Sequence, residues 1–384
     1  MIKGAIIIEG HVQGLANTRA LGEAGIPVVV IDQNDCIASK SKYCSAFFKC
    51  PDFRSAEFIE FLLDLALNEN LSEWSLIPSN DHIVYNLSQN IDKIKCVYKT
   101  IVPEPFQLAN IYNKQKLLEC AERVNVPIPK TYYPQTINIS DFCFDFPVIL
   151  KGKFGLSFYK TFRKKVFIAK NQNHLQQLLT TISIKFDLSK VFIQEIIPFT
   201  ENNKTISFTA FCINGSVKTY WIGQKLREHP WKFGTATFTE SIHNNTVREY
   251  AEQLLQSLKY TGVCEVEFLY HSIAKEYQLI EINPRTWLWV GLAKANGINY
   301  ALYLYNFLNG IESEYPKNYQ TGLRWRNFWT DTVYSWQAIL KGKLKLKDYS
   351  NSLTTTTIDA VRSKDDPKPF RAMTKMLFAL AARR

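Results

Sequence analysis

Uninterrupted apolar runs and a mixed polar segment alternate at the start of the chain. The runs AIIIEG (5–10) and IPVVVID (26–32) have the pattern of strands that are covered on both faces. Between them, HVQGLANTRALGEAG (11–25) has the spacing of a helix. The pattern predicts a βαβ opening, and therefore an α/β fold in the first part of the chain. A further amphipathic helix is expected at 55–70.

A β-hairpin is the clearest element in the second half of the chain. GVCEVEFLY (262–270) and YQLIEIN (277–283) are rich in β-branched and aromatic residues, and the polar turn HSIAKE separates them. Because side chains alternate along a strand, Glu281 and Asn283 share one face. Folding the hairpin about its turn brings Glu267 close to Glu281, about 5 Å between Cβ atoms if the two are directly opposed.

The pattern changes again at three points along the chain. The first unit closes near VPEP (102–105), and the next stretch alternates helices and short strands, which predicts an α+β unit. Residues 190–228 contain a run of antiparallel strands. The tail 311–384 holds the lysine run LKGKLKLKD, the run TTTT, the motif DDPKPF and a final basic amphipathic helix. We therefore expect an α/β domain, α+β lobes and a C-terminal extension.

The glutamates of the hairpin are the first candidates for chemistry. Two carboxylates placed this close repel each other unless a cation lies between them. A solvated face on which the acids find lysines is one solution, and a hard-cation site is the other. Two carboxylates and a carboxamide suit Mg²⁺, which leaves coordination positions for substrate phosphates. Glu265 shares the face of Glu267, so the pattern does not decide which of them would bind.

Four basic residues stand where an anion could be bound. Lys114 lies on a helix, and Lys151 follows the apolar strand PVIL, where an unpaired charge is costly. Lys225 and Arg227, at i and i+2, project from one side of a strand. Each has a plainer interpretation: a solvated helix face, a strand end that reaches water, or a basic surface.

Composition and cysteine usage indicate the class of protein and its compartment. The chain has 384 residues, of which 46% are hydrophobic and 21% charged, as in a globular protein of two or three domains. Its eight cysteines form no CxxC pair and no Cys/His cluster with zinc spacing, so we expect free thiols in a reducing compartment. The first apolar run is too short for a signal peptide, and no run is long enough for a membrane span. We expect a cytoplasmic protein.

The net charge of +11 is unevenly distributed. Residues 1–105 carry 9 Lys and Arg against 13 Asp and Glu, whereas residues 106–384 carry 37 against 22. A basic body favours anionic ligands such as nucleotide phosphates, acidic metabolites, nucleic acid or anionic lipid. A lysine- and asparagine-rich composition throughout the chain is the plainer explanation. Because no recognition motif accompanies the charge, we expect no nucleic-acid partner.

The first βα turn carries half of a dinucleotide-binding fingerprint. Gly10 and Gly14 are spaced G-x-x-x-G rather than G-x-G-x-x-G. Asp32 ends the second strand, where such folds keep the acid that binds the ribose. A nicotinamide-dependent oxidoreductase is therefore a rival interpretation, against which the glycine spacing argues.

The motifs of nearly the whole chain resemble, in their order, the ATP-grasp family with a pre-ATP-grasp domain in front. Lys114 opens NKQKLLECAERVNVPIPKT, and Lys151 ends FPVILK. QEII (194–197) is similar to the family's adenine hinge, and VEF (266–268) with EINPR (281–285) is similar to its closing pattern. GQKLREHPWKFGTATFTES, EINPRTW and DDPKPF look like the amino-acid ligase branch that includes D-aspartate ligase.

The resemblance implies four segments along the chain. They are a Rossmann-like pre-ATP-grasp domain (1–105), an ATP-grasp small lobe (106–192), a large lobe with the metal site (193–310) and a C-terminal extension (311–384).

The resemblance also implies roles for individual residues. The residues implied to bind ATP are Lys114 and Lys151 at the phosphates, Gln194, Glu195, Ile196 and Ile197 at the adenine, and Glu201 at the ribose. The residues implied to bind two Mg²⁺ ions, with Mn²⁺ as a substitute, are Glu267, Glu281 and Asn283. Arg285 is implied to contact phosphate or the charged intermediate. Lys225 or Arg227 would join Arg285 in stabilising the oxyanion.

The phosphate-covering loop departs from the family's pattern. KGKFGLSFYKTFRKK (151–165) contains only two glycines, so it offers fewer free backbone N–H groups to phosphate. Lys153, Lys160, Arg163 or Lys164 could compensate for them.

The function implied is that of an ATP-dependent carboxylate–amine ligase. It would join a small-molecule carboxylate and an amine, on an amino acid or a cell-envelope or secondary metabolite, and release ADP and phosphate. The alternatives are carboxylation of a small acceptor through carboxyphosphate, and an inactive nucleotide-binding scaffold. For the C-terminal helix (370–384) we expect packing on its own chain or on a partner in a homodimer, with an anionic membrane as the alternative.

Overall fold

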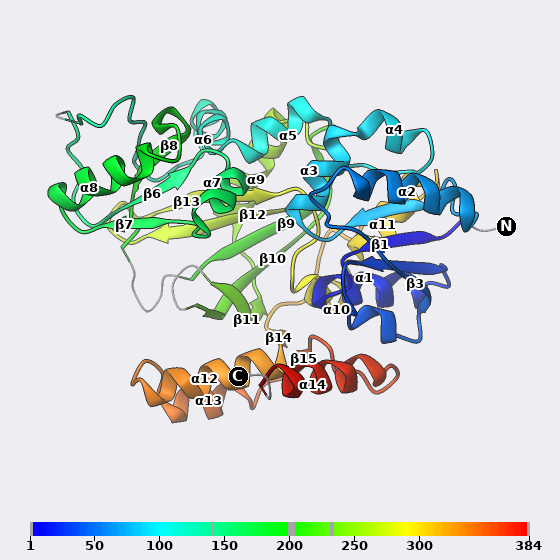
Figure 1. The fold of residues 1–384 in the computed structure, drawn as a ribbon. Coiled ribbons are helices and arrows are strands. Elements are labelled where there is room, and N and C mark those ends of the chain that lie inside the picture. Colours follow the sequence, from blue (N-terminus) through cyan, green and yellow to red (C-terminus); the bar gives the residue numbers. More distant parts are fainter. Residues whose placement is uncertain (1–2, 140, 199–203, 231–233, 382–384) are drawn as a thin grey trace.

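Three β-sheets organise the chain. The computed structural model describes residues 3–139, 141–198, 204–230 and 234–381 (Figure 1). The first sheet and its helices lie on one side of the molecule, a smaller lobe lies on the other, and the largest sheet runs between them. The last helices form a layer along the far edge of the large sheet. The combination of α/β and α+β architecture that the sequence predicts is confirmed.

The first sheet is parallel, in the order β3-β2-β1-β4. Its strands are β1 (Ala5–Ile8), β2 (Val28–Asp32), β3 (Cys44–Lys49) and β4 (Ser75–Pro78). Alternate residues of β1 enter different cores, as the period of a strand requires. Ala5 and Ile7 pack toward α1 (Val12–Gly22), whereas Ile6 and Ile8 pack toward α2 (Glu57–Asn68). The core on the α1 side continues into the large sheet, so the first domain and the rest of the molecule share a hydrophobic core.

The small lobe is a four-stranded antiparallel sheet covered by two helices. Its strands, in the order β5-β8-β6-β7, are β5 (Thr131–Tyr132), β8 (Val191–Glu195), β6 (Val148–Gly152) and β7 (Phe167–Ala169). The helices are α7 (Gly155–Phe162) and α8 (Gln172–Ser183). Phe158, Leu175 and Leu179 fill a core that is separate from the other two.

The large sheet has seven strands, in the order β13-β12-β9-β10-β11-β14-β15. They are β9 (Ile206–Ile213), β10 (Ser216–His229), β11 (Thr235–Ser241), β12 (Gly262–His271), β13 (Glu276–Asn283), β14 (Arg324–Arg326) and β15 (Thr357–Asp359). The tail therefore extends this sheet by two strands at one edge, and β14 and β15 pair in parallel.

The remaining helices connect and cover these sheets. They are α3 (Asp81–Gln89), α4 (Ile91–Lys95), α5 (Pro105–Tyr112), α6 (Lys114–Arg123), α9 (Asn245–Ser257), α10 (Val290–Ala295), α11 (Tyr300–Leu308), α12 (Phe328–Leu340), α13 (Leu346–Ser352) and α14 (Lys368–Ala381), with single 3₁₀ turns at Ala38–Lys40 and Leu188–Lys190. All eight cysteines are free.

Candidate active site

The predicted hairpin forms with the expected register. Strands β12 and β13 pair antiparallel, with Glu267 opposite Glu281 and Glu265 opposite Asn283. On its other edge β12 pairs with β9, which places Ser207 beside Glu267. One face of three adjacent strands therefore presents these carboxylates together, as their alternation predicts.

Each glutamate of the pair Glu267 and Glu281 has a lysine partner. Both oxygens of Glu267 lie 3.0 Å from Lys225 Nζ on β10, and both side chains are 12% exposed. Burial opposes the charge on Lys225, but Glu267 and Glu265 outweigh it and raise the pKa of this lysine. Lys114, at the start of α6, lies 3.1 Å from Glu281 and lowers the pKa of that carboxyl. Each of the two glutamates therefore has an ammonium group within hydrogen-bonding distance.

Glu265 is enclosed differently from Glu267. Ser207 Oγ donates to one of its oxygens at 2.8 Å, and Asn283 Nδ2 donates to the other at 3.0 Å. Burial and the neighbouring Glu267 raise the pKa of Glu265 to about 8. The sequence pattern leaves open whether Glu265 or Glu267 would bind a metal ion. In the structure, Glu267 contacts the ammonium group of Lys225, whereas Glu265 accepts hydrogen bonds from the neutral side chains of Ser207 and Asn283.

Lys151 is a buried-strand lysine without an acidic partner. It is the penultimate residue of β6, lies opposite Phe192 and is half-buried. Burial, followed by repulsion from Lys114, lowers its pKa to about 8, although Glu281 acts in the opposite direction. Among the described residues, no carboxylate forms an ion pair with Lys151, and no hydrogen bond is made by its ammonium group. Burying an ammonium group without a partner anion costs free energy, and an anion bound beside Lys151 would offset this cost.

The proposed adenine segment lies at the edge of the small lobe. Gln194 is buried and donates to Thr131 Oγ1, and Glu195 accepts from the backbone N–H of Lys130. After Glu195 the chain leaves the strand, and Ile196 and Ile197 make no backbone hydrogen bond with another described residue. Glu201, expected at the ribose, lies outside the described residues.

Arg285 binds Asp81 of the first domain, an acid that no sequence pattern connects with it. Its guanidinium donates to both oxygens of Asp81, at 2.8 and 3.0 Å, and also to Asn283 Oδ1 at 3.3 Å. Burial disfavours its charge, but Asp81 raises the pKa of Arg285. Tyr112 also contacts Asp81, so the site joins the first domain and the large sheet.

Arg227 is held by the C-terminal layer. Although it stands two residues from Lys225 on β10, the register of that strand shifts between the two. Its guanidinium donates to both oxygens of the buried Asp331 of α12, at 2.7 Å each, and to Ser352 of α13. The structure thus brings Lys225 to the glutamates and gives Arg227 a partner on α12.

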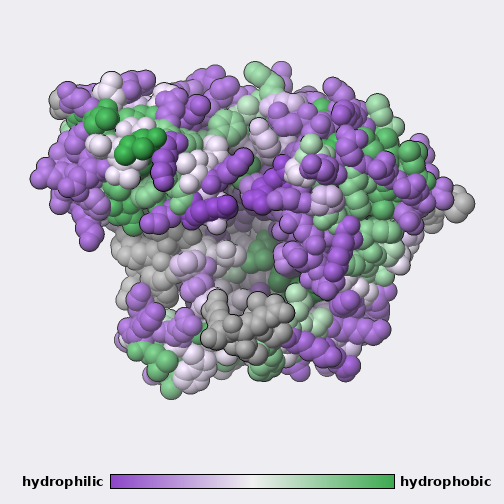
Figure 2. All heavy atoms as spheres, in the orientation of Figure 1, coloured by the Kyte–Doolittle hydropathy of each residue, from purple (hydrophilic) through white to green (hydrophobic). Residues whose placement is uncertain are grey.

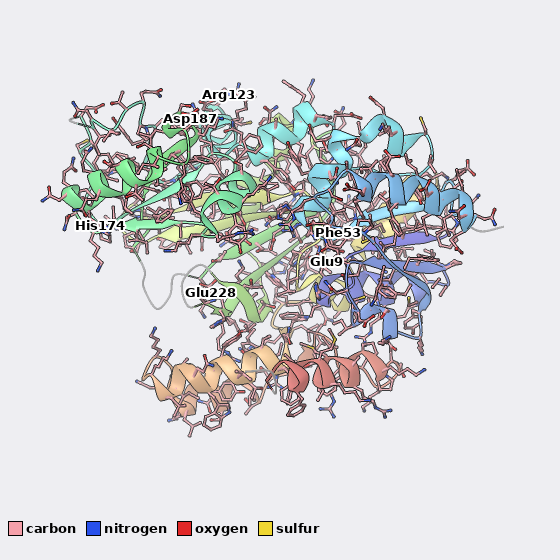
Figure 3. The ribbon with its side chains drawn as sticks, viewed as in Figure 1. Glu9, Phe53, Arg123, His174, Asp187 and Glu228 are labelled. Atoms are coloured by element: carbon pink, nitrogen blue, oxygen red, sulfur yellow. The ribbon has the colours of Figure 1, made fainter. Side chains whose placement is uncertain are left out.

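Glu9 is a second residue that the sequence reading missed. It follows β1 with a φ of 76°, a conformation that is rare for a residue with a side chain. Burial raises its pKa, while a hydrogen bond from Asn80 and the charges of His11 and Arg285 lower it. Figure 3 shows Glu9 on the side of the first domain that faces the rest of the molecule. Its place at the carboxyl end of a parallel strand was the available signal.

The partial dinucleotide-binding fingerprint of the first βα turn, formed by Gly10, Gly14 and Asp32, has a structural explanation. Asp32 accepts from the backbone N–H of Gly10 at 2.8 Å, so its carboxylate fastens the turn. A Cβ on Gly14 would lie 2.0 Å from the carbonyl oxygen of Glu9. These residues shape the loop that carries Glu9, which removes the main support for a nicotinamide site.

The phosphate-covering segment is largely helical. Gly155–Phe162 forms α7, with Phe158 buried against Gly152. Of the four cations expected to compensate, Lys153 lies over the ring of Tyr133 and Lys164 over that of Phe167. Lys160 and Arg163 are exposed.

The donor set fits a nucleotide with Mg²⁺. No three His, Cys, Asp or Glu side chains of the described chain are grouped to hold a metal ion. Two carboxylates and one carboxamide would instead leave most coordination positions to phosphate oxygens and water, which is the usual form of a Mg²⁺–nucleotide site. Lys151, which has no acidic partner among the described residues, would be the complementary cation for a phosphate.

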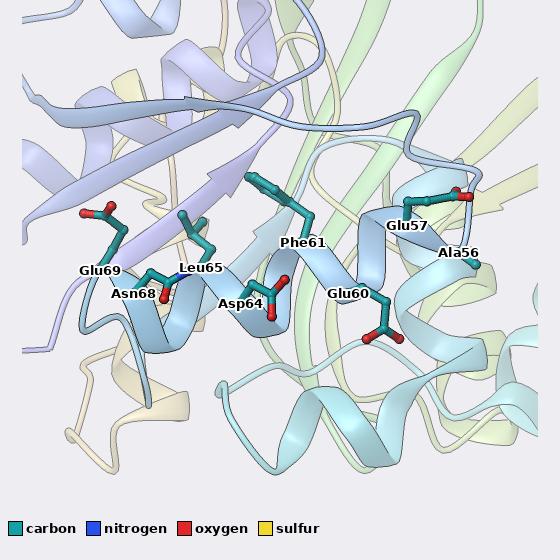
Figure 4. Close-up of a pocket in the computed structure, with 8 residues that line it drawn as sticks. All are labelled: Ala56, Glu57, Glu60, Phe61, Asp64, Leu65, Asn68 and Glu69. Carbon is teal, nitrogen blue, oxygen red and sulfur yellow. The ribbon is translucent and has the colours of Figure 1, made fainter.

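Two other features lie apart from this site. The side chains of Trp221, Trp287 and Trp289 are almost fully buried and pack on one another, so they belong to the core. A surface depression of about 590 Å³ follows α2 (Figure 4). Its acidic lining does not suit an anionic ligand. The residues that line it are Ala56, Glu57, Glu60, Phe61, Asp64, Leu65, Asn68 and Glu69.

Comparison with known proteins agrees with this geometry. Residues 234–301, which include the hairpin and Arg285, match the family described as carbamoyl-phosphate synthase L chain, ATP binding domain. The chain is 23% identical over 261 residues to a D-aspartate ligase of Enterococcus faecium (strain Aus0004). This match covers 64% of the chain and 62% of that relative, so the chain spans less than two thirds of its length.

Solved structures share the fold at low sequence identity. A biotin carboxylase from Campylobacter jejuni has a TM-score of 0.66 at 18% identity, covering 84% of this chain and 74% of its own. An L-amino acid ligase from Bacillus licheniformis has a TM-score of 0.59 at 12% identity, covering 80% and 75%. The resemblance that the motifs carry is confirmed: this chain has the ATP-grasp fold.

Proposed function

We propose that this protein is an ATP-dependent carboxylate–amine ligase. The γ-phosphoryl group of ATP would pass to an oxygen of a substrate carboxylate, which gives an acyl phosphate and ADP. An amine would then attack the acyl carbon, form the amide and release phosphate and a proton. The observation that carries the proposal is the unpaired Lys151 beside two lysine–glutamate pairs on one sheet face.

Each residue of the site has a defined part in this proposal. Lys151 and Lys114 would bind the phosphates, and the segment 194–197 would hold the adenine. Glu267, Glu281 and Asn283 would hold Mg²⁺, which when bound would neutralise phosphate charge. Arg285 and Lys225 would stabilise developing negative charge by position and electrostatics rather than by covalent chemistry. Arg227, paired with Asp331, would position α12.

The match to D-aspartate ligase supports an amino acid as one substrate. The hollow between the small lobe and the first domain is bordered by hydrophilic side chains (Figure 2). Glu9 and the Asp81–Arg285 pair come from the first domain and the large sheet. A small charged substrate would therefore meet groups of both signs.

The reaction is tested by its products. With ATP, Mg²⁺ and panels of carboxylates and amino acids, we expect release of ADP and phosphate rather than AMP and pyrophosphate. Hydroxylamine should replace the amine and give the hydroxamate of the true carboxylate. Lys151→Ala should lower hydroxamate formation about ten- to a thousand-fold, the scale for removal of one preorganised charge-stabilising group. Lys185→Ala, at an exposed lysine of the same lobe, is the matched control.

Three results would contradict the proposal. AMP formation with the right carboxylate would overturn the phosphoryl-transfer step. ADP release that requires bicarbonate and yields no hydroxamate would favour carboxylation, the chemistry named for the biotin carboxylase neighbour. Nucleotide binding without turnover for every substrate pair would favour a scaffold.

A further inference from the structure

Helix α12 presents an apolar stripe to solvent. Asp331 and Ser335 are buried and mark the side of α12 that faces the large sheet. Val333, Trp336 and Leu340 follow at spacings of three and four residues, which places them on the opposite side of the helix. Their side chains are 47%, 48% and 83% exposed. We call these three residues the outer stripe of α12.

Helix α14 covers only the beginning of this side of α12. Trp329, one turn before Val333, packs against Phe370 and Phe378, and its Nε1 donates to Thr374. Phe370 and Met373 also contact the main core, so α14 packs on its own chain as expected. Beyond Trp329 the stripe stays open, and the exposed Phe378 extends its apolar surface.

A row of lysines directly follows the stripe. The four exposed lysines Lys341, Lys343, Lys345 and Lys347 run from the end of α12 into the first turn of α13, with Leu344 and Leu346 among them. None of the four forms an ion pair with an acid of the described residues. The whole segment 328–384 carries eleven Lys and Arg against five Asp. Of these five, Asp331 and Asp366 are neutralised by internal arginines.

We propose that the outer stripe of α12 and this lysine row dock the protein on an anionic bilayer surface. A tryptophan and leucines followed by lysines match the chemistry of a membrane interface, where aromatic rings lie at the headgroups and lysines reach anionic phosphates. No helix in the described ranges is long and apolar enough to cross a bilayer.

A second copy of the chain is a poorer occupant of this surface. A two-fold contact would place the same patch on both subunits, so both copies would bring the same excess of lysines to it. The stripe lies on α12, in the outer layer of helices that Figure 1 shows, and Figure 2 shows apolar residues among hydrophilic ones in this layer. Separate projecting side chains and flexible lysines suit a fluid surface.

Docking would be coupled to the candidate active site through β10. This strand carries Lys225, which contacts Glu267, and Arg227, which anchors α12 through Asp331. The bilayer would therefore lie at a fixed position relative to the site, whatever reaction the site performs.

Vesicle co-sedimentation of the full-length protein tests the proposal. We expect it to pellet with phosphatidylcholine–phosphatidylglycerol vesicles, and to stay in solution with phosphatidylcholine alone or at high salt. The double variant Trp336→Gln/Leu340→Gln should bind at least about tenfold more weakly, and so should Lys343→Gln/Lys345→Gln. The controls are Leu67→Gln/Ile184→Gln, at exposed apolar residues elsewhere on the surface, and Lys93→Gln/Lys185→Gln.

Folding and self-association are separated from lipid binding by two measurements. Circular dichroism melts should be unchanged in all four variants, because every substituted side chain is exposed. Equal pelleting of the wild type with both kinds of vesicle, or equal binding by variants and controls, would overturn the proposal. So would sedimentation equilibrium without lipid that shows a dimer which Trp336→Gln/Leu340→Gln abolishes.

Discussion

At the scale of single residues, the site combines local and distant contributions. The face shared by Glu267, Glu281 and Asn283 follows from strand alternation and one turn, so it could be predicted from the sequence. Asp81 lies 204 positions from Arg285 in the chain, and no periodicity connects them. Strand alternation also predicts that Lys225 and Arg227 project from the same side of β10, but the register of this strand shifts between them. Arg227 therefore pairs with Asp331 instead of joining Lys225 at the glutamates.

Replacement of Glu281 tests the metal-site proposal at this scale. Glu281→Gln keeps the shape of the side chain but removes the charge that would hold Mg²⁺ and that pairs with Lys114. We expect ATP turnover to fall about a hundred- to a thousand-fold. Because the pair is partly exposed, the free energy of unfolding should change by about 1 kcal/mol or less. ADP release and urea denaturation measure the two effects.

Glu276→Gln, on the same strand, is the control for this substitution. Turnover by Glu281→Gln that matches the wild type at limiting Mg²⁺ would remove Glu281 from the metal site.

At the scale of elements, the strands with long apolar runs could be predicted from the sequence, whereas α7 and the short strands of the tail could not. The apolar runs of β1, β2, β12 and β13 specify buried or half-buried strands locally. The helix α7 lies in the segment that was expected to be a phosphate-covering loop, and its Phe158 fills the lobe core over Gly152. The short strands β14 and β15 pair with distant partners, and three-residue segments carry too little pattern to predict.

The attachment of α12 depends on one buried ion pair. Asp331 is fully buried and accepts from Arg227 and Thr237, while the Arg227 guanidinium lies 4.0 Å from the centre of the Phe238 ring. Asp331→Ala would leave this guanidinium without its anion, and we expect a loss of about 3–5 kcal/mol in the free energy of unfolding. Urea denaturation should show it.

Two further variants make this prediction specific. Asp348→Ala, at an exposed acid of α13, should cost almost nothing. Arg227→Met combined with Asp331→Leu should recover much of the loss, because no unpaired charge remains. Equal costs for Asp331→Ala and Asp348→Ala would contradict the structural role given to the pair.

At the scale of the whole molecule, the tail closes back onto the first domain. Asp366, in the DDPKPF motif, is buried and pairs with Arg19 of α1 at 3.0 Å. It also accepts from Ser41 Oγ and from the backbone N–H of Lys42. Arg19 in turn donates to the carbonyl oxygens of Val361 and Asp366. The sequence marks this motif, but its partner could not be predicted, because the contact spans 347 positions.

This closure should depend on pH in a defined direction. Burial alone would raise the pKa of Asp366, but hydrogen bonds from Ser41 and Lys42 and the charge of Arg19 lower it below its ordinary value of 3.8. A carboxyl with a depressed folded-state pKa stabilises the fold above its unfolded pKa, and that stability is lost as pH falls through the folded value. We expect Asp366→Asn to melt below the wild type at neutral pH, with the difference shrinking under about pH 4.

The control is Asp365→Asn, at the exposed neighbour, which should melt like the wild type at every pH. When trypsin is added to Asp366→Asn, the first cleavage should fall in the tail. A melting difference that stays constant down to the most acidic conditions would show that the Asp366 carboxylate does not fasten the tail to the first domain.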